Sequence, residues 1–232
     1  MRVRMIVVDV DGTLTDERGV VRHEVIKALE DLSSAGFKVV LSSGNAFPIV
    51  AGLSYYLPVY RYAIAENGGV VGTKGWRKVL GSEEKARRAR AIILERMGDV
   101  IYESWQNCYR HVDMAFHIKK GVDVEQVVSK LREMLKGLGV VVEHSGWALH
   151  VRDEKVDKGV GLLEACKDMG IKPEEVVAIG DSDTDVPMFK VAGFSIAMSN
   201  ATPRLRAVAS MVVSRGYYRG FLEAATYLLK AF

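Results

Sequence analysis

Short apolar runs alternate with helical patterns along most of the chain. The runs cover residues 3–8, 37–41, 62–65, 176–179 and 194–198, and each stops at polar or glycine residues. The helix predicted after the first run ends near Gly36 and has its apolar face at Val25, Ile26, Leu29 and Leu32. Near-continuous apolar runs separated by helices are typical of parallel strands covered on both faces. The pattern therefore predicts an α/β fold built on a parallel sheet.

The pattern changes between residues 81 and 153. Two amphipathic helices are expected there, over 82–97 and about 124–138, and the segments around them alternate apolar and polar residues. The segments 140–143 and 147–151 flank Ser145-Gly146, which indicates a hairpin with a two-residue turn. Alternation is typical of an antiparallel sheet with one covered face. We therefore expect a core of residues 1–80 and 154–232, interrupted by a small α+β domain of residues 81–153.

Length and composition agree with this division and exclude several classes of protein. The chain has 232 residues, more than one average domain of about 150 residues. Its hydrophobic content of 49% excludes a disordered chain. The net charge of +3 is too small to indicate a nucleic-acid partner, and the basic segment 85–90 is typical of a solvated helix face.

No feature of the sequence indicates a membrane or an oxidising compartment. Asp9 ends the first apolar run too early for a signal peptide, and no apolar stretch reaches about 18 residues. The two cysteines, Cys108 and Cys166, form no CxxC pair. We therefore expect a cytoplasmic protein with no membrane partner. The tyrosine pairs 55–56 and 217–218 leave a homodimer open, although half-buried packing is the commoner role of such pairs.

Carboxylates gather after two of the predicted strands. Asp9 and Asp11 follow the first strand, and Asp181, Asp183 and Asp185 follow the strand at 176–179. Ligands of open parallel sheets bind at the carboxyl ends of the strands, so these groups should share one crevice. Clustered carboxylates repel one another unless a proton or a cation lies between them.

Magnesium is the cation that this pattern favours. A calcium-binding EF-hand would need Gly and Glu where the chain has Val186 and Ala192. Mg²⁺ is instead usually held by a few carboxylates together with substrate phosphate and water. The pattern therefore predicts a Mg²⁺ site and a phosphorylated ligand.

Two further elements carry groups suited to a phosphate. Lys158 stands at a predicted helix start, where the helix dipole disfavours a cation. Taken alone it is a solvated lysine, but beside a carboxylate nucleophile and a phosphate it would supply positive charge. Ser43, Gly44 and Asn45 follow the second strand, and their hydroxyl and N–H groups could hold phosphoryl oxygens. Ser-Gly loops are common, so this second signal is weak alone.

These elements stand in the order of the four motifs of the haloacid dehalogenase (HAD) superfamily, which the chain resembles. The matching residues are 9–13, Ser43-Gly44, Lys158 and 180–185. The resemblance implies a Rossmann-like core, and the insert looks like the type-2 cap of the Cof-like branch. The short cap and Ser-Gly-Asn, in place of the common Thr-Gly-Arg, are most similar to archaeal-type phosphoglycolate phosphatases. Asn45 departs from the family's usual arginine, so no role is carried over to it from that arginine.

The resemblance implies Mg²⁺-dependent hydrolysis of a small phosphorylated metabolite. Asp9 would attack phosphorus and form an aspartyl-phosphate, and Asp11 would protonate the leaving alkoxide and then activate water. Mg²⁺ would bind the Asp9 carboxylate, the Asp11 backbone carbonyl and Asp181, with Asp185 as a further ligand or just outside the ligand sphere.

Phosphate-binding and supporting groups follow from the same resemblance. Lys158 and Ser43, with Gly44, would hold the phosphoryl group and the charge of its transition state. Asn200, at another strand end, would orient this network; Asn45 is kept as a candidate supporting residue, with no role supplied by the resemblance. Asp183 is expected to be only a loop residue.

The favoured substrate is 2-phosphoglycolate, whose hydrolysis gives glycolate and phosphate. A cationic group in the cap would help to bind its carboxylate, and Arg110 and Arg152 are the candidates. Arginines at such strand positions are, however, more commonly solvated. His111, His117 and His150 are expected to pack. A sugar-phosphate phosphatase, a phosphomutase and a non-catalytic phosphate-binding regulatory module remain alternatives; receiver-type modules, however, are shorter and lack the insert.

Overall fold

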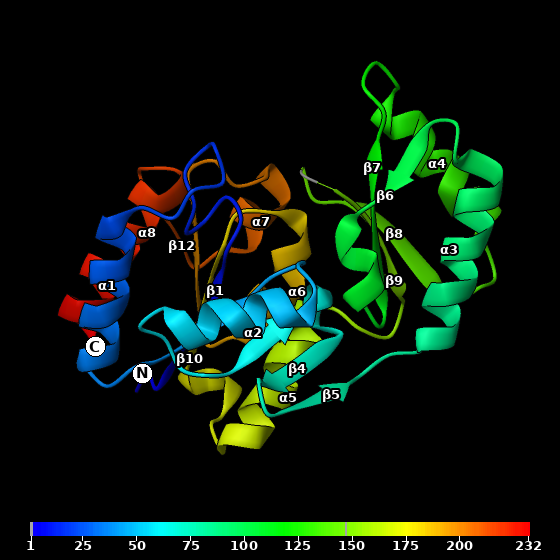
Figure 1. Ribbon diagram of the computed structural model, residues 1–232. Coiled ribbons are helices and arrows are strands. Elements are labelled where there is room, and N and C mark those ends of the chain that lie inside the picture. The colour runs from blue at the N-terminus through cyan, green and yellow to red at the C-terminus, as the bar shows by residue number, and fades with distance from the viewer. Residues whose placement is uncertain (1, 147) are drawn as a thin grey trace.

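The computed structural model describes residues 2–146 and 148–232, which form two sheets (Figure 1). The strands of the larger sheet are β1 (Met5–Asp9), β2 (Lys38–Ser42), β3 (Ala63–Ala65), β4 (Val70–Thr73), β5 (Trp76–Val79), β10 (Val176–Gly180), β11 (Phe194–Ala197) and β12 (Met211–Val212). Their order across the sheet is β12-β11-β10-β1-β2-β3-β4-β5. The two central neighbours, β1 and β10, therefore come from opposite ends of the chain.

The strands from β12 to β3 pair in parallel, which confirms the predicted α/β fold. Every residue of β1 and β10 is buried, because helices cover both faces of the sheet. At the far edge, β4 and β5 pair antiparallel as a hairpin that the apolar pattern did not indicate. Its outer strand is half polar, and Trp76 and Arg77 there are exposed.

Alternate residues of β1 belong to two separate cores. Ile6 and Val8 pack with helices α1 (His23–Ser34), α2 (Phe47–Tyr56) and α8 (Tyr217–Ala231). Met5 and Val7 pack with helices α5 (Lys158–Met169), α6 (Val186–Val191) and α7 (Pro203–Val208).

The buried apolar face of α1 is narrower than the sequence pattern predicts. Val25, Leu29 and Leu32 are buried, as expected. Ile26, by contrast, is 42% exposed. It follows Val25 by one residue, about 100° around the helix, and therefore lies outside the buried stripe.

The smaller sheet and its two helices lie beside this core, at the right of Figure 1. Its antiparallel order is β6-β7-β9-β8, formed by β6 (Ile101–Glu103), β7 (Asp113–Ile118), β8 (Val140–His144) and β9 (Leu149–Asp153). Helices α3 (Glu83–Met97) and α4 (Val124–Met134) share one apolar cluster with it. All these elements fall within residues 81–153, and we refer to this part as the cap.

Two details of the cap differ from the sequence-based prediction. Helix α4 ends at Met134 rather than near residue 138. The antiparallel pairing of β8 with β9 confirms the predicted hairpin, but His144 pairs with Leu149 and Ser145 N–H donates to the Ala148 carbonyl at 3.0 Å, so the placement of the turn at Ser145-Gly146 is wrong. Trp147, which was predicted to start the second strand, lies outside the described residues.

Within residues 2–146 and 148–232, four short 3₁₀ turns complete the fold: η1 (Glu66–Gly68), η2 (Trp105–Tyr109), η3 (Pro173–Glu175) and η4 (Asp183–Asp185). The turns η1 and η4 follow strand ends of the larger sheet, and η2 lies in the cap. In the described part of the chain, no helix has the length and apolar character needed to cross a membrane.

Candidate active site

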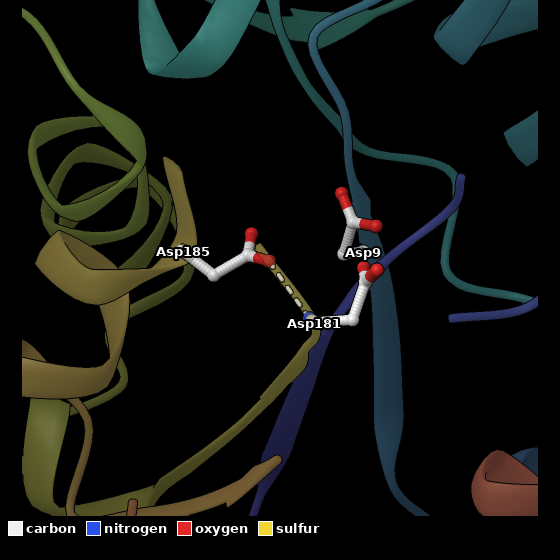
Figure 2. Close-up of side chains that lie close together, drawn as sticks. All are labelled: Asp9, Asp181 and Asp185. Atoms are coloured by element: carbon white, nitrogen blue, oxygen red, sulfur yellow. Dashed lines mark hydrogen bonds between the residues drawn. The ribbon is translucent and has the colours of Figure 1, made fainter. Parts of the chain in front are cut away.

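Three carboxylates converge at the carboxyl ends of β1 and β10. Asp9 is the last residue of β1, Asp181 directly follows β10, and Asp185 belongs to η4. Figure 2 shows these side chains directed into a common space. One oxygen from each carboxylate lies within 4.8 Å of the others. Asp9 and Asp185 are buried and Asp181 is half-buried, so this cluster could hold a metal ion.

The turn after β10 fixes the direction of Asp185. The Oδ2 atom of Asp185 accepts hydrogen bonds from the backbone N–H groups of Asp181 at 3.0 Å and Ser182 at 2.9 Å. The first of these bonds is the dashed line in Figure 2. Because these two bonds occupy Oδ2, the other oxygen, Oδ1, remains for the groups of the cluster.

Lys158 connects two of these carboxylates. It is the first residue of α5, a helix capped by Asp157, whose side chain accepts from Val160 N–H. Its Nζ donates to Asp9 Oδ1 at 2.5 Å and to Asp185 Oδ1 at 2.6 Å. The lysine side chain is only 2% exposed, so it is not a solvated residue of a helix start.

Burial and repulsion dominate the electrostatics of the cluster. Burial raises the pKa of Asp9 well above its usual range, and the Lys158 ammonium offsets this only in part. Burial and the charge of Asp185 raise the pKa of Asp181 to about 7. Burial alone would lower the pKa of Lys158, but the charges of Asp185 and Asp9 outweigh it and raise this pKa. Three carboxylates thus face one ammonium, and the excess negative charge favours a bound cation.

Asp181 is held by its neighbours from two directions. Thr13 Oγ1 donates to its Oδ1 at 3.0 Å, and Asn200 Nδ2 donates to its Oδ2 at 3.1 Å. Gly12 adopts a φ of +88°, and a Cβ at this position would overlap the Asp181 carboxylate. The glycine is therefore required both by the turn and by the close approach of Asp181.

Asp11 lies at the same end of β1 but forms a separate set of contacts. Asn45 Nδ2 donates to Asp11 Oδ2 at 2.8 Å and to Ser43 Oγ at 3.0 Å. The Ser43 hydroxyl also faces Asp11 Oδ2, at 3.4 Å. The asparagine that replaces the family's usual arginine therefore orients the Asp11 carboxylate with a neutral donor.

A cavity of about 250 Å³ separates these groups from the cap. Asp9, Asp11, Gly44 and Lys158 line its core side, and side chains of η2, β7 and β9 line its cap side. Gln106 of η2 spans the two sides: its Nε2 donates to Asn45 Oδ1 and its Oε1 accepts from Ala46 N–H, both at 2.8 Å. Asn45 is thus in contact with both Asp11 and the cap.

Two residues whose role was not predicted attach the cap to the core. Glu66 and Asn67 of η1 have positive φ angles of 52° and 51°. Glu66 Oε2 accepts from the N–H groups of His111 at 2.8 Å and Val112 at 2.9 Å, and Asn67 Nδ2 donates to Asp113 Oδ2 at 2.9 Å. No local pattern in the sequence indicates that these side chains contact the cap.

The structure corrects the expectation that the two cap arginines are solvated. Arg110 is 8% exposed and Arg152 is 6% exposed. Arg110 lines the cavity, whereas Arg152 is not among its described lining residues. His117 and His150, which were expected only to pack, also line the cavity.

His111 and Asp183 lie away from this group. The ring of His111 contacts Glu83 of α3. Asp183 is exposed and accepts from Thr202 Oγ1 at 2.5 Å. Neither residue is among the described residues that line the cavity.

Comparisons with known proteins cover nearly the whole chain. A family model described as haloacid dehalogenase-like hydrolase matches residues 6–96 and 95–224. A phosphoglycolate phosphatase of Methanoculleus marisnigri is 34% identical over 226 residues, which are 96% of this chain and 95% of that protein. A phosphoglycolate phosphatase of Metallosphaera sedula is 35% identical over an alignment of 233 positions that covers 98% of this chain and 99% of that protein. A crystal structure from Thermoplasma acidophilum has a TM-score of 0.88 at 25% identity and covers 100% of both chains.

Proposed function

The chain belongs to the haloacid dehalogenase-like hydrolases, and on this basis we propose that it is a Mg²⁺-dependent phosphatase acting on 2-phosphoglycolate. Family membership confirms the resemblance inferred from the sequence motifs. The observation that carries the proposal is the buried Asp9–Lys158–Asp185 network, with Asp11 beside it at the same cavity.

The donors of the carboxylate cluster fit Mg²⁺. This cation prefers oxygen ligands and is usually bound by one or two carboxylates together with substrate phosphate. Asp9 and Asp181, with the Asp11 backbone carbonyl, would hold it, and Asp185 would be a further ligand or lie just outside. The excess negative charge of the cluster supports this assignment. When bound, the ion supplies positive charge for the phosphoryl oxygens.

Asp9 is the proposed nucleophile. Lys158 holds its carboxylate at 2.5 Å and favours the ionised form, which burial disfavours. An oxygen of Asp9 forms a bond to phosphorus while the bond between phosphorus and the ester oxygen breaks, leaving an aspartyl-phosphate. Lys158 Nζ and the Ser43-Gly44 loop hold the phosphoryl oxygens during this step.

Asp11 carries the proton. Asn45 occupies its Oδ2, which leaves Oδ1 to give a proton to the departing alkoxide. The same oxygen then takes a proton from the water that attacks phosphorus. The bond between phosphorus and the Asp9 oxygen breaks, which releases phosphate and regenerates the Asp9 carboxylate.

The size of the cavity favours a small leaving group. Its volume of about 250 Å³ corresponds to roughly eight water molecules at ~30 Å³ each. Sites for drug-sized ligands are larger, about 300–1,000 Å³. A small phosphomonoester such as 2-phosphoglycolate fits this volume. The relatives named phosphoglycolate phosphatases support the same substrate.

A phosphate-release screen with purified protein and Mg²⁺ tests the proposal. We expect 2-phosphoglycolate to have the highest kcat/KM among small phosphomonoesters, and Asp9→Asn to remain folded but inactive. A higher value for sugar phosphates would favour a sugar-phosphate phosphatase. Phosphate transfer between sugar positions without release would indicate a phosphomutase, and a stable phosphoprotein without turnover would indicate a regulatory module.

A further inference from the structure

A buried acid in the cap binds two side chains that line the cavity. Asp113, at the start of β7, is fully buried. Its Oδ2 accepts from His150 Nδ1 at 2.8 Å and faces Arg110 Nη1 at 3.4 Å, and its backbone oxygen accepts from the same Nη1 at 3.1 Å. Burial would raise the pKa of Asp113, but the charges of His150 and Arg110 outweigh it and lower this pKa. Asp113 therefore stays ionised behind Arg110 and His150.

One edge of the Arg110 guanidinium has unused donors. Asp113 occupies Nη1, whereas Nε has no hydrogen-bond partner among residues 2–146 and 148–232. Nη2 has only a long contact of 3.4 Å with Gln106 Oε1. The side chain is 2% exposed, so bulk water does not satisfy these donors. Arg152 Nε is also buried without a partner, so an unpaired Nε does not by itself indicate a ligand; what distinguishes Arg110 is that it lines the cavity.

The free edge matches a carboxylate. Nε and Nη2 of an arginine present two parallel N–H groups, a geometry that carboxylates accept bidentately. Arg90 of α3 uses the same two nitrogens to bind Glu103, at 2.6 Å and 2.8 Å. Arg110 lacks such a carboxylate among the described residues, and it lines the cavity.

His150 adds a second group at the same wall. Its Nδ1 donates to the ionised Asp113, which leaves Nε2 for a ligand. The ring also lies close to Gly44, since a Cβ on that glycine would meet His150 Cε1 at 3.1 Å. His150 thus approaches the loop proposed to hold the phosphoryl group.

From this arrangement we propose that Arg110, supported by His150, binds the carboxylate of the leaving group and selects phosphomonoesters of small hydroxy acids. The inference rests on the proposed phosphatase function and deepens it. With the phosphoryl group at Lys158 and Asp9 on the core side, the acid end of the substrate meets the guanidinium on the cap side. Asp113 is a positioning residue, because it holds both side chains and is itself fully buried.

The test compares two substrates that differ only at the carboxylate. These are 2-phosphoglycolate and 2-hydroxyethyl phosphate, in which a neutral CH₂OH replaces the acid. We measure the ratio of their kcat/KM values with the full chain and Mg²⁺. Loss of a charge-assisted hydrogen bond should lower this ratio by about 10- to 100-fold in Arg110→Met, mainly through the KM for phosphoglycolate.

Three further variants separate recognition from structure. Arg110→Lys keeps the positive charge but lacks the two parallel N–H donors of the guanidinium. Its ratio should lie between those of the wild type and Arg110→Met. His150→Asn keeps a donor toward Asp113, removes Nε2, and should lower the ratio several-fold. Arg152→Met is the matched control: this buried arginine binds the Val156 carbonyl and Glu143 and should keep the wild-type ratio.

The outcomes distinguish this inference from the proposed function. An unchanged ratio in Arg110→Met, or an equal fall in Arg152→Met, overturns the carboxylate site while leaving the phosphatase activity established. If Arg110→Met does not fold, an unchanged ratio in Arg110→Lys and His150→Asn overturns it equally. If the wild type hydrolyses neither substrate nor any other phosphomonoester, the proposed function fails and the inference falls with it.

Discussion

Replacing Lys158 by methionine tests whether this residue compensates the buried carboxylates. Methionine has a similar length but provides no charge and no donor. The substitution removes bonds of 2.5 Å to Asp9 and 2.6 Å to Asp185 from a site where the lysine is 2% exposed. Without a metal ion, no other cation is bonded to these two carboxylates among the described residues.

The expected loss of stability follows from the burial of the pair. Removing one partner of a buried ion pair costs about 3–5 kcal/mol, because a charge remains uncompensated. Burial already raises the pKa of Asp9, so a carboxylate can take up a proton, and we adopt the lower value of about 3 kcal/mol. For a chain of about 150–250 residues this lowers the midpoint of thermal unfolding by roughly 6–12 °C.

Thermal unfolding in EDTA, followed by circular dichroism, measures this shift. Lys78→Met is the matched control, because Lys78 also contacts two carboxylates, Glu164 and Asp168, but at the surface. Exposed ion pairs contribute little, so its midpoint should stay close to that of the wild type. Equal shifts for the two variants would refute the view that Lys158 stabilises a buried cluster. In activity assays with Mg²⁺, Lys158→Met should lose about 10²-fold or more in kcat.

Three further predictions concern the groups around Asp11 and Asp181. Asn45→Ala and Gln106→Ala should each lower kcat by about tenfold, because Gln106 holds the asparagine that orients Asp11. In steady-state kinetics the double variant should lose less activity than the product of the two single losses. A loss equal to that product would contradict the coupling. Gly12→Ala places a side chain on a backbone with a φ of +88°, where it also overlaps Asp181. Chemical denaturation should therefore show a fall of more than about 1 kcal/mol in the free energy of unfolding, and an unfolding curve like that of the wild type would contradict this. Asp181→Asn removes a carboxylate that its neighbours repel, so the midpoint of thermal unfolding in EDTA should rise. The increase in this midpoint on adding Mg²⁺ should be smaller than in the wild type. A lower midpoint in EDTA would show that repulsion does not dominate.

Much of the core was predictable because its signals are local. The apolar runs at β1 and β10 identify buried strands, and the carboxyl ends of parallel strands meet at one edge. Asp9 and Asp181 could therefore be placed together although most of the chain separates them. The hairpin β4–β5 escaped prediction because an exposed edge strand lacks the continuous apolar run of a central one.

The contacts between core and cap were not predictable in the same way. Lys158 is a typical solvated residue in its own segment, and only carboxylates from β1 and η4 explain its burial. Arg110 pairs with Asp113 three residues further on, but its place in the cavity wall depends on how the cap lies over the core. Asn45 stood out only as a departure from a familiar motif. Its contact with Gln106 depends on how the two sheets lie against each other, which hydrophobic periodicity does not encode.

Covalent trapping tests the central claim that Asp9 is the nucleophile of a phosphatase. The experiment uses Asp11→Asn with Mg²⁺ and 4-nitrophenyl phosphate, whose leaving group needs no proton, and analyses the chain and its peptides by mass spectrometry. We predict one added phosphoryl group on the peptide containing Asp9, and none when Asp9→Asn is combined with Asp11→Asn. Phosphorylation of another residue, or release of phosphate from the variant lacking Asp9, would contradict the account.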